Sequence, residues 1–189
     1  MKPLLISADA AAPQAWRNGG GQTRELLTWP HQGPWRLRIS RADIGADGPF
    51  SAFPGVTRWF AVLHGKGVAL TFDGRRQEVL AGGPALCFDG AQTPQCSLLA
   101  GPTQDLNLMA IGGRSTMAPA QPDVAWSGSW TMRGLYTPVA GVWRGAGVQQ
   151  PVAAHHLLWL EQAAAGAWTF TPAPDADGQA WWLGFTPEE

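Results

Sequence analysis

The sequence predicts an all-β protein, and three observations carry this prediction. Gly and Pro number 24 and 16 in a chain of 189 residues, which favours short strands joined by tight turns over long helices. Apolar and polar residues alternate in several short segments, and turn signals such as Asp73-Gly74 separate these segments. Hydrophobic residues make up 45% of the chain, enough for a core, which excludes a disordered protein.

The expected strands of the first part of the chain follow from this patterning. Residues 35–40 alternate, so Leu37 and Ile39 share one face, and Arg38 and Ser40 share the other. Residues 59–63 are nearly all apolar, as in a central strand, and residues 64–67 predict a hairpin turn. Further short strands are expected at 68–72, 79–80, 85–88, 97–99 and 106–109. Such an arrangement is typical of an antiparallel sandwich or small barrel.

The chain is predicted to divide into two halves that form one compact unit. The first half covers residues 1–111, a linker rich in Gly, Pro, Ser and Ala covers 112–129, and the second half covers 130–189. Strands are expected at 157–161, 167–170 and 181–185, although the alanines at 163–165 leave a short helix over 156–165 open. The order of these segments resembles residues 59–88, which suggests a duplicated barrel.

Composition and charge exclude several classes of protein. Thirteen basic and fourteen acidic residues give a net charge of −1, so there is no basic excess for binding nucleic acid. No stretch approaches the ~18 apolar residues of a membrane helix, and the first residues do not resemble a secretion signal. We therefore expect a cytoplasmic protein. Cys87 and Cys96 are too few for a disulfide framework or a cysteine zinc site, and we expect buried free thiols.

The sharpest local motif is the glycine-rich segment at residues 16–25. Its three glycines could cradle a phosphate, but the Lys-Ser/Thr of a P-loop is missing, which argues against nucleotide binding. The alternative is a glycine turn that enters a strand, on which Thr23 and Glu25 share one face. A turn flanked by Asn18 and Glu25 could border a ligand pocket.

Two later segments carry polar residues in an apolar setting. Arg58 opens the apolar strand at 59–63, where a guanidinium needs a partner or a wet cavity. In residues 105–109, alternation places Asp105, Asn107 and Met109 on one face. This polar face is either plain surface or the inside of a barrel mouth.

Four motifs follow one another: Trp-Arg-Asn-Gly-Gly-Gly-x-Thr-Arg-Glu at 16–25, Asp-Gly-Pro-Phe-Ser-x-Phe-Pro-Gly-x-x-Arg at 47–58, Leu-x-Gly-x-Gly at 63–67 and Asp-Leu-Asn-Leu-Met at 105–109. Together they resemble the motif set of the HutD/Ves family, a cupin-fold family linked to histidine utilisation and environmental stress. The resemblance covers roughly residues 14–110. It implies a cupin-type (RmlC-like) jelly-roll barrel, and we expect a compact bicupin with a degenerate second half.

The cupin resemblance also allows a test for metal binding. Alignment on residues 63–65 places Ser51 and Phe53 where a metal-binding cupin has its two His ligands, and Arg58 where it has Glu. No His stands at 90–94, where the last ligand would lie. Metals such as zinc, iron or manganese need imidazole or carboxylate ligands, whereas an arginine favours a carboxylate. We therefore expect no metal and no cofactor.

The resemblance implies a non-catalytic accessory or regulator of histidine utilisation that binds a small anionic metabolite, such as urocanate or formylglutamate. The residues expected to bind it are Asn18, Thr23, Glu25, Arg38, Ser40, Arg58 and Asn107. One alternative is a metal-independent isomerase in which Glu25 is the base and Arg58 stabilises negative charge. Another is a stress-related interaction module with an exposed tryptophan surface. The sequence leaves a homodimer open.

Overall fold

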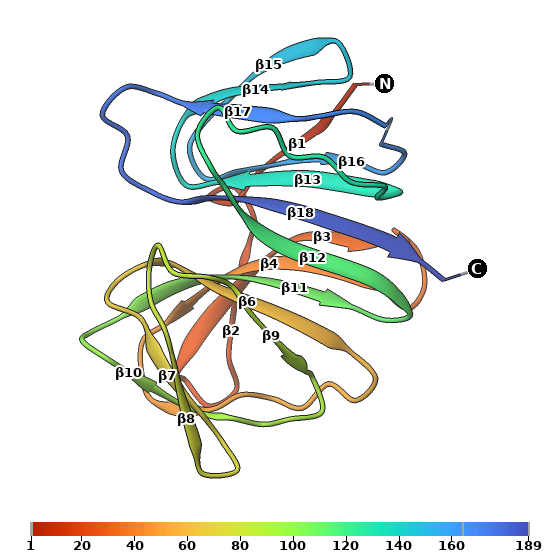
Figure 1. Cartoon of the computed structure of the whole chain (residues 1–189). Helices are drawn as coiled ribbons and strands as arrows, with labels where there is room; N and C mark the ends of the chain where they lie inside the picture. Colours follow the sequence, from red (N-terminus) through yellow and green to blue (C-terminus); the bar gives the residue numbers. More distant parts are fainter. Residues whose placement is uncertain (1, 164, 189) are drawn as a thin grey trace. The chain divides into compact units, whose positions relative to one another are not determined.

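The computed structural model describes residues 2–163 and 165–188, and these residues form eighteen β-strands and no α-helix. Of the part of the chain described, nothing forms a helix long and apolar enough to cross a membrane. The chain divides into two compact units. The first unit is Ala11–Gly112, and the second unit is Met1–Ala10 together with Gly113–Glu189 (Figure 1). The all-β prediction is confirmed.

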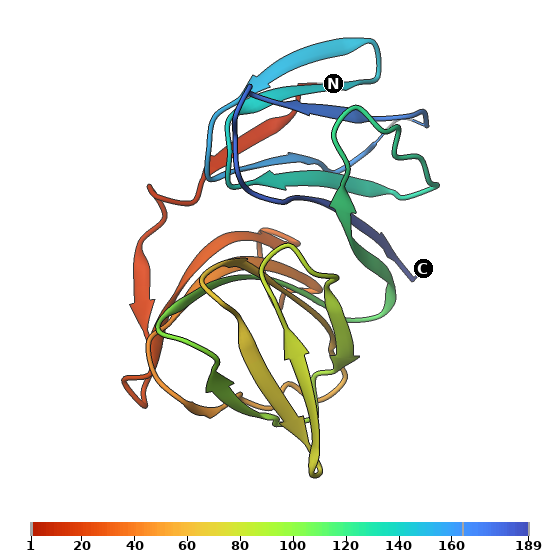
Figure 2. The same cartoon turned by 60° about the vertical axis from the view of Figure 1, so that its left-hand side comes forward.

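Two antiparallel sheets build the first unit, and Figure 2 shows their strands curving around a common interior. The six-stranded sheet has the order β2-β3-β4-β11-β6-β9, with β2 Pro13–Ala15, β3 Gly21–Trp29, β4 Leu37–Ile44, β11 Thr103–Ala110, β6 Thr57–His64 and β9 Leu86–Asp89. The four-stranded sheet has the order β5-β10-β7-β8, with β5 Gly48–Pro49, β10 Gln95–Leu98, β7 Val68–Phe72 and β8 Arg75–Val79. The core of the first unit includes Phe50, Phe60, Val62 and Leu70.

Two antiparallel sheets also build the second unit. The five-stranded sheet has the order β1-β16-β13-β18-β12, with β1 Leu4–Ser7, β16 His156–Leu160, β13 Met132–Thr137, β18 Ala180–Pro187 and β12 Gly113–Ala120. The three-stranded sheet has the order β15-β14-β17, with β15 Val148–Val152, β14 Gly141–Gly145 and β17 Thr169–Pro172. The core of the second unit is dominated by Trp143, Trp168 and Trp182.

The two units repeat one pattern of strand pairing. In the first unit β6 pairs with β9 and β11, and β7 pairs with β8 and β10. In the second unit β13 pairs with β16 and β18, and β14 pairs with β15 and β17. The run β6 to β11 therefore corresponds strand by strand to β13 to β18. The suggested duplication is thus present, but its predicted alignment was wrong, because residues 157–160 form β16, which corresponds to β9 and not to β6.

The repeat extends to the turns between strands. Asp73-Gly74 connects β7 to β8, and Ala146-Gly147 connects β14 to β15. All four residues have positive φ, between 44° and 81°, as a two-residue hairpin of type I′ requires. The predicted turn at 64–67 is also confirmed, since β6 ends at His64 and β7 begins at Val68.

The structure differs from the sequence predictions in four places. The expected linker at 112–129 contains β12, which pairs along its full length with β18. The first ten residues belong to the second unit, because β1 pairs with β16. The helix left open over 156–165 is replaced by β16 at 156–160, and residue 164 lies outside the described residues. Both cysteines are free, but Cys87 is exposed on the edge strand β9, and only Cys96 is buried.

Candidate functional site

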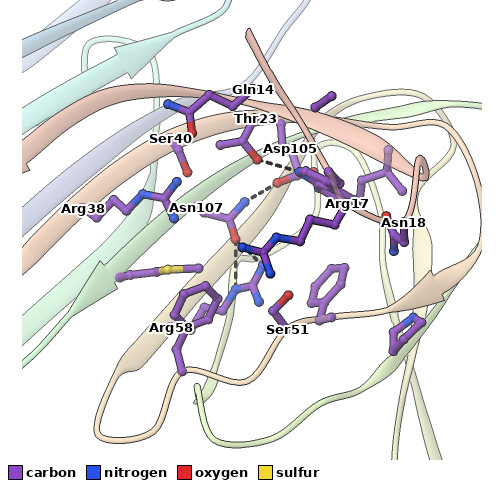
Figure 3. Close-up of a pocket in the computed structure, with 18 residues that line it drawn as sticks. Gln14, Arg17, Asn18, Thr23, Arg38, Ser40, Ser51, Arg58, Asp105 and Asn107 are labelled. Carbon is purple, nitrogen blue, oxygen red and sulfur yellow. Dashed lines mark hydrogen bonds between the residues drawn. The ribbon is translucent and has the colours of Figure 1, made fainter.

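The first unit encloses a cavity of about 530 Å³. Its walls come from β3, β4, β6 and β11 and from the segments at 14–18 and 49–53 (Figure 3). The residues that line it are Gln14, Ala15, Trp16, Arg17, Asn18, Thr23, Arg38, Ser40, Ala42, Ile44, Pro49, Phe50, Ser51, Phe53, Arg58, Asp105, Asn107 and Met109. Aromatic and aliphatic walls with a few converging polar groups are typical of a small-molecule site.

The glycine-rich motif shapes one side of this cavity. Gly19 has φ of +70°, and a Cβ atom on Gly21 would lie 2.3 Å from the Asp43 carbonyl oxygen, so both positions require glycine. The Trp16 backbone N–H donates to the Gly21 carbonyl, and its indole N–H donates to Thr23 Oγ1 at 2.8 Å. The turn thereby holds residues 16–18 against the cavity, and Figure 3 shows the Arg17 side chain extending over it.

The second motif forms another part of the cavity wall. The Phe50 N–H donates to the Pro94 carbonyl at 3.0 Å, and the Phe53 N–H donates to the Gly90 carbonyl at 2.6 Å. These bonds fix the irregular segment between β5 and β6. They leave the Phe50 ring 4.4 Å from the Arg58 guanidinium carbon, a cation–π distance.

A chain of three polar side chains lies at the centre of the cavity. Arg58 is 8% exposed, and its Nε and Nη2 donate to Asn107 Oδ1 at 3.0 and 2.8 Å. The Asn107 Nδ2 in turn donates to Asp105 Oδ1. Within the described residues, Arg58 Nη1 makes no hydrogen bond, and neither does the buried Asp105 Oδ2. Arg58 therefore retains a donor for an occupant of the cavity.

Burial changes the ionisation of these groups. Desolvation raises the pKa of Asp105 to about 8, although Arg58 and the hydrogen bond from Asn107 act in the opposite direction. Desolvation lowers the pKa of Arg58 to about 10, so this guanidinium remains charged at neutral pH. Asp105 is thus mostly neutral at pH 7. Together with Arg17 and Arg38, Arg58 gives the cavity a positive charge.

Six of the seven predicted binding residues line this one cavity: Asn18, Thr23, Arg38, Ser40, Arg58 and Asn107. Glu25 is not among the lining residues, and its carboxylate Oε2 accepts a hydrogen bond from Arg38 Nε at 2.9 Å. The Asn18 side chain accepts from the Gly20 N–H at 3.0 Å and so also stabilises the glycine turn. Glu25 does not line the cavity, and its Oε2 is paired with Arg38. The geometry therefore does not support Glu25 as a catalytic base.

Sequence reasoning missed two charged lining residues, Arg17 and Asp105. Both lie in the recognised motifs, and Asp105 shares the strand face of Asn107. The alternation of β11 was therefore a sufficient signal for Asp105. Arg17 gave no such signal, because it lies in a turn, where spacing does not predict the direction of a side chain.

Two further expectations can be compared with the structure. Ser51, Phe53 and Arg58, which occupy the aligned metal-ligand positions of a cupin, all line the cavity. Among residues 2–163 and 165–188, no three His, Cys, Asp or Glu side chains are grouped as metal ligands. The interaction-module hypothesis included the expectation of an exposed tryptophan surface. This expectation was wrong, since all eleven tryptophans are buried or half-buried.

Comparison with known proteins identifies the family. The HutD family model matches residues 8–177, most of the chain. The chain belongs to the HutD family. A structure of HutD from Pseudomonas fluorescens SBW25 is similar to it, with 24% identity, coverage of 97% of this chain and 99% of that chain, and a TM-score of 0.82.

Two sequence relatives agree with this membership. An uncharacterized 21.2 kDa protein in the hutC 3' region of Pseudomonas putida is 38% identical over 109 residues, which span 56% of each chain. The match thus covers just over half the length of that relative. Protein Ves of Cronobacter sakazakii is 29% identical over 143 residues, 68% of this chain and 79% of that protein.

A more distant structure supports the cupin fold of this HutD family member. A mutant of Bacillus subtilis oxalate decarboxylase has a TM-score of 0.63 at 10% identity and covers 97% of this chain and 77% of that one. At this identity the likeness concerns the fold alone. The cupin-type fold predicted from the motifs is confirmed.

Proposed function

We propose that this HutD family protein binds a small carboxylate-bearing metabolite of histidine utilisation in the cavity of the first unit and acts as a non-catalytic regulator or accessory. One observation carries the proposal: Arg58 is buried, remains charged and has an unused donor that faces a cavity of metabolite size. A buried guanidinium favours an anionic partner, most naturally a carboxylate that accepts two hydrogen bonds.

The names of similar proteins support the metabolic setting. One relative lies in the hutC 3' region, and the Pseudomonas fluorescens HutD structure was obtained in a formate condition, formate being the smallest carboxylate. Urocanate and formylglutamate are the candidate ligands. The aromatic walls formed by Trp16, Phe50 and Phe53 favour the planar urocanate. A cytoplasmic location is part of this proposal, because the intermediates of intracellular catabolism are found there.

Calorimetric titration of the full chain with urocanate, formylglutamate and formate tests the proposal. We expect saturable binding of one carboxylate in the presence of EDTA and at least a hundredfold loss of affinity in Arg58→Ala. The matched control is Arg75→Ala, which removes an exposed arginine on β8, far from the cavity lining. Equal affinity in the wild type and Arg58→Ala would overturn the proposal.

Turnover is measured in the same samples. We expect each bound metabolite to be recovered unchanged after prolonged incubation. Chemical conversion that Arg58→Ala abolishes would replace the regulator proposal with an enzymatic function in the same cavity.

A further inference from the structure

The orientation of the Asn107 amide is fixed by Arg58. A guanidinium carries only donors, so the atom that receives Arg58 Nε and Nη2 must be the Asn107 oxygen. The Asn107 amide nitrogen then necessarily points the other way, toward Asp105 Oδ1. The amide cannot be flipped without placing donors against donors at Arg58.

This orientation determines where Asp105 can hold a proton. Oδ1 accepts from Asn107, so a proton on this carboxyl group must sit on Oδ2. Asp105 is 1% exposed and lines the cavity, and Oδ2 is buried without a hydrogen-bond partner among the described residues. A buried polar atom without a partner is costly, and an occupant of the cavity can supply the missing partner.

The charges around Asp105 determine which form it takes. They are Arg58 on β6, Arg38 and Asp43 on β4, Cys96 on β10 and Arg17 in the segment between β2 and β3. The pKa of Cys96 is raised to about 12, mainly by burial, so this thiol stays neutral over the accessible range. An anion bound to Arg58 adds negative charge beside Asp105, which further favours the neutral carboxylic acid.

We propose that Asp105 binds the anion as a neutral carboxylic acid, with Oδ2–H donating to an acceptor oxygen of the ligand whose charge Arg58 neutralises. This inference rests on the proposed function and narrows its ligand class. Arg58 and Asp105 then present only donors to the ligand, so the site disfavours a carboxylate that carries a cationic donor beside it. An α-amino acid carries an ammonium donor beside its carboxylate and fits poorly. Histidine is therefore expected to bind at least tenfold more weakly than urocanate.

A carboxamide at position 105 imitates the neutral acid. With Asn107 fixed, Asn at position 105 must turn its oxygen toward Asn107 and its NH₂ donor to the position of Oδ2. A leucine at 105 has similar size but no donor. Asp43→Asn serves as the control for loss of a carboxylate, because Asp43 lies on the neighbouring strand β4 outside the cavity lining.

The experiment measures the affinity of the full chain for formylglutamate and formate, whose carboxylates do not titrate between pH 7 and pH 9. Because only the protonated fraction of Asp105 is competent, wild-type affinity is expected to fall about tenfold from pH 7 to pH 9. In Asp105→Asn the pH dependence disappears. Asp105→Leu binds at least tenfold more weakly than Asp105→Asn at pH 7. Asp43→Asn keeps a fall of affinity with rising pH, shifted toward lower pH because the Asp43 charge raises the Asp105 pKa.

The outcomes separate this inference from the proposed function. Binding that depends on Arg58 but not on pH in the wild type overturns the role of Asp105 and leaves the proposed function intact. Loss of binding in Asp105→Asn has the same meaning, since an ionised acceptor would then be required. If neither anion binds the wild type at any pH, both proposals fail. Carboxyl ¹³C NMR of the unliganded protein reports Asp105 directly, and an ionised Asp105 at pH 7 overturns the inference without any ligand.

Discussion

Each unit buries one arginine on the corresponding strand, β6 or β13, but the surroundings of the two arginines differ. Arg58 in the first unit lines a cavity and shares one amide oxygen between two of its nitrogens. Arg133 in the second unit is 0% exposed and donates to the carbonyls of Gly166 and Trp126 at 2.7 and 3.0 Å. Its guanidinium carbon lies 4.1 Å from the Trp168 ring and 4.6 Å from the Trp126 ring.

The aromatic contacts show how similar the two settings are. The Phe50 N–H donates to the residue that precedes β10, and the Trp126 N–H donates to Trp168, the residue that precedes β17. Each aromatic ring then packs on the arginine of its own unit. The units diverge on the last strand of the repeat, where β11 carries Asp105 and Asn107 and β18 carries Trp182 instead.

This difference is the reason why a ligand site is proposed in the first unit and not in the second. Trp182 stacks on Trp126 at 5.3 Å, so indole rings fill the space around Arg133. Both Nη atoms of Arg133 donate to carbonyls and its faces meet tryptophans, and these contacts give it a structural role, although its buried Nε has no hydrogen-bond partner among the described residues. A buried arginine that faces a cavity and keeps a free donor can bind a ligand. Seven of the eleven tryptophans lie in the second unit: Trp126, Trp130, Trp143, Trp159, Trp168, Trp181 and Trp182.

The largest effect is expected from removal of the indole that fills the second unit. Trp182→Ala is expected to destabilise the protein by about 3–5 kcal/mol, because a buried Trp leaves a cavity that its neighbours cannot close. Urea denaturation followed by tryptophan fluorescence measures this loss. The matched change, Asn107→Ala, is expected to cost less stability but to abolish anion binding. The comparison breaks if Trp182→Ala impairs anion binding as strongly as Asn107→Ala does.

Exchange of each arginine for Met tests the two roles directly. Arg133→Met leaves two buried carbonyls without donors and is expected to cost about 2–4 kcal/mol, with no change in anion affinity. Arg58→Met is expected to abolish binding at a smaller cost in stability, since its donors serve a side chain that can hydrate from the cavity. Denaturation and calorimetry on the same two variants give both quantities. Comparable stability losses would remove the proposed distinction.

Much of the first unit could be predicted from the sequence because its strands carry their own patterns. Residues 35–40 and 59–63 alternate or are continuously apolar, and both lie within observed strands. The face shared by Asp105, Asn107 and Met109 follows from alternation and lines the cavity. Six predicted binding residues converge for the same reason: they lie on strands that the sequence predicts or beside a glycine turn.

The remaining features depend on contacts that no local pattern records. β12 has little apolar alternation, and it forms because β18 provides a partner along its whole length. β1 pairs with a strand about 150 residues later, so its place in the second unit could not be read locally. The tryptophans around Arg133 come from the residue before β17, from β18 and from the segment between β12 and β13, and only the folded chain brings them together.

The titration of Asp105 offers an effect that is smaller per pH unit and that further separates the units. Because its pKa is raised to about 8 in the folded chain, the folded protein holds a proton that the unfolded chain releases near pH 4. Stability from this neutral acid is present below pH 4 and is lost as pH rises toward 8. Wild type should therefore lose roughly 1.4 kcal/mol per pH unit between pH 5 and pH 8 relative to Asp105→Asn.

Urea denaturation of both proteins across this range measures the slope, and Asp43→Asn is the control, for which no such slope relative to wild type is expected between pH 5 and pH 8. Burial alone would raise the Asp43 pKa, but hydrogen bonds from Gln104 and Gln22 outweigh it, and the pKa is lowered. The stability that Asp43 provides is present at neutral pH and is lost as pH falls below 4. A flat difference between wild type and Asp105→Asn would show that Asp105 is ionised in the folded protein.

The smallest effects are expected at the two hairpin turns that the units share. Gly74 and Gly147 have φ of +81° and +73°, and a Cβ atom at either position would meet nothing within 4 Å. Alanine at each site therefore carries only the backbone cost of the left-handed conformation, about 1 kcal/mol. Gly65→Ala is the contrasting control, because its Cβ would lie 2.7 Å from the Pro102 carbonyl oxygen. Thermal denaturation of the three variants compares these costs.

Equal losses at Gly74 and Gly147 are expected if the hairpins have the same geometry and differ only in their surroundings. A loss confined to one of them would mean that the repeat preserves strand pairing without preserving the turn.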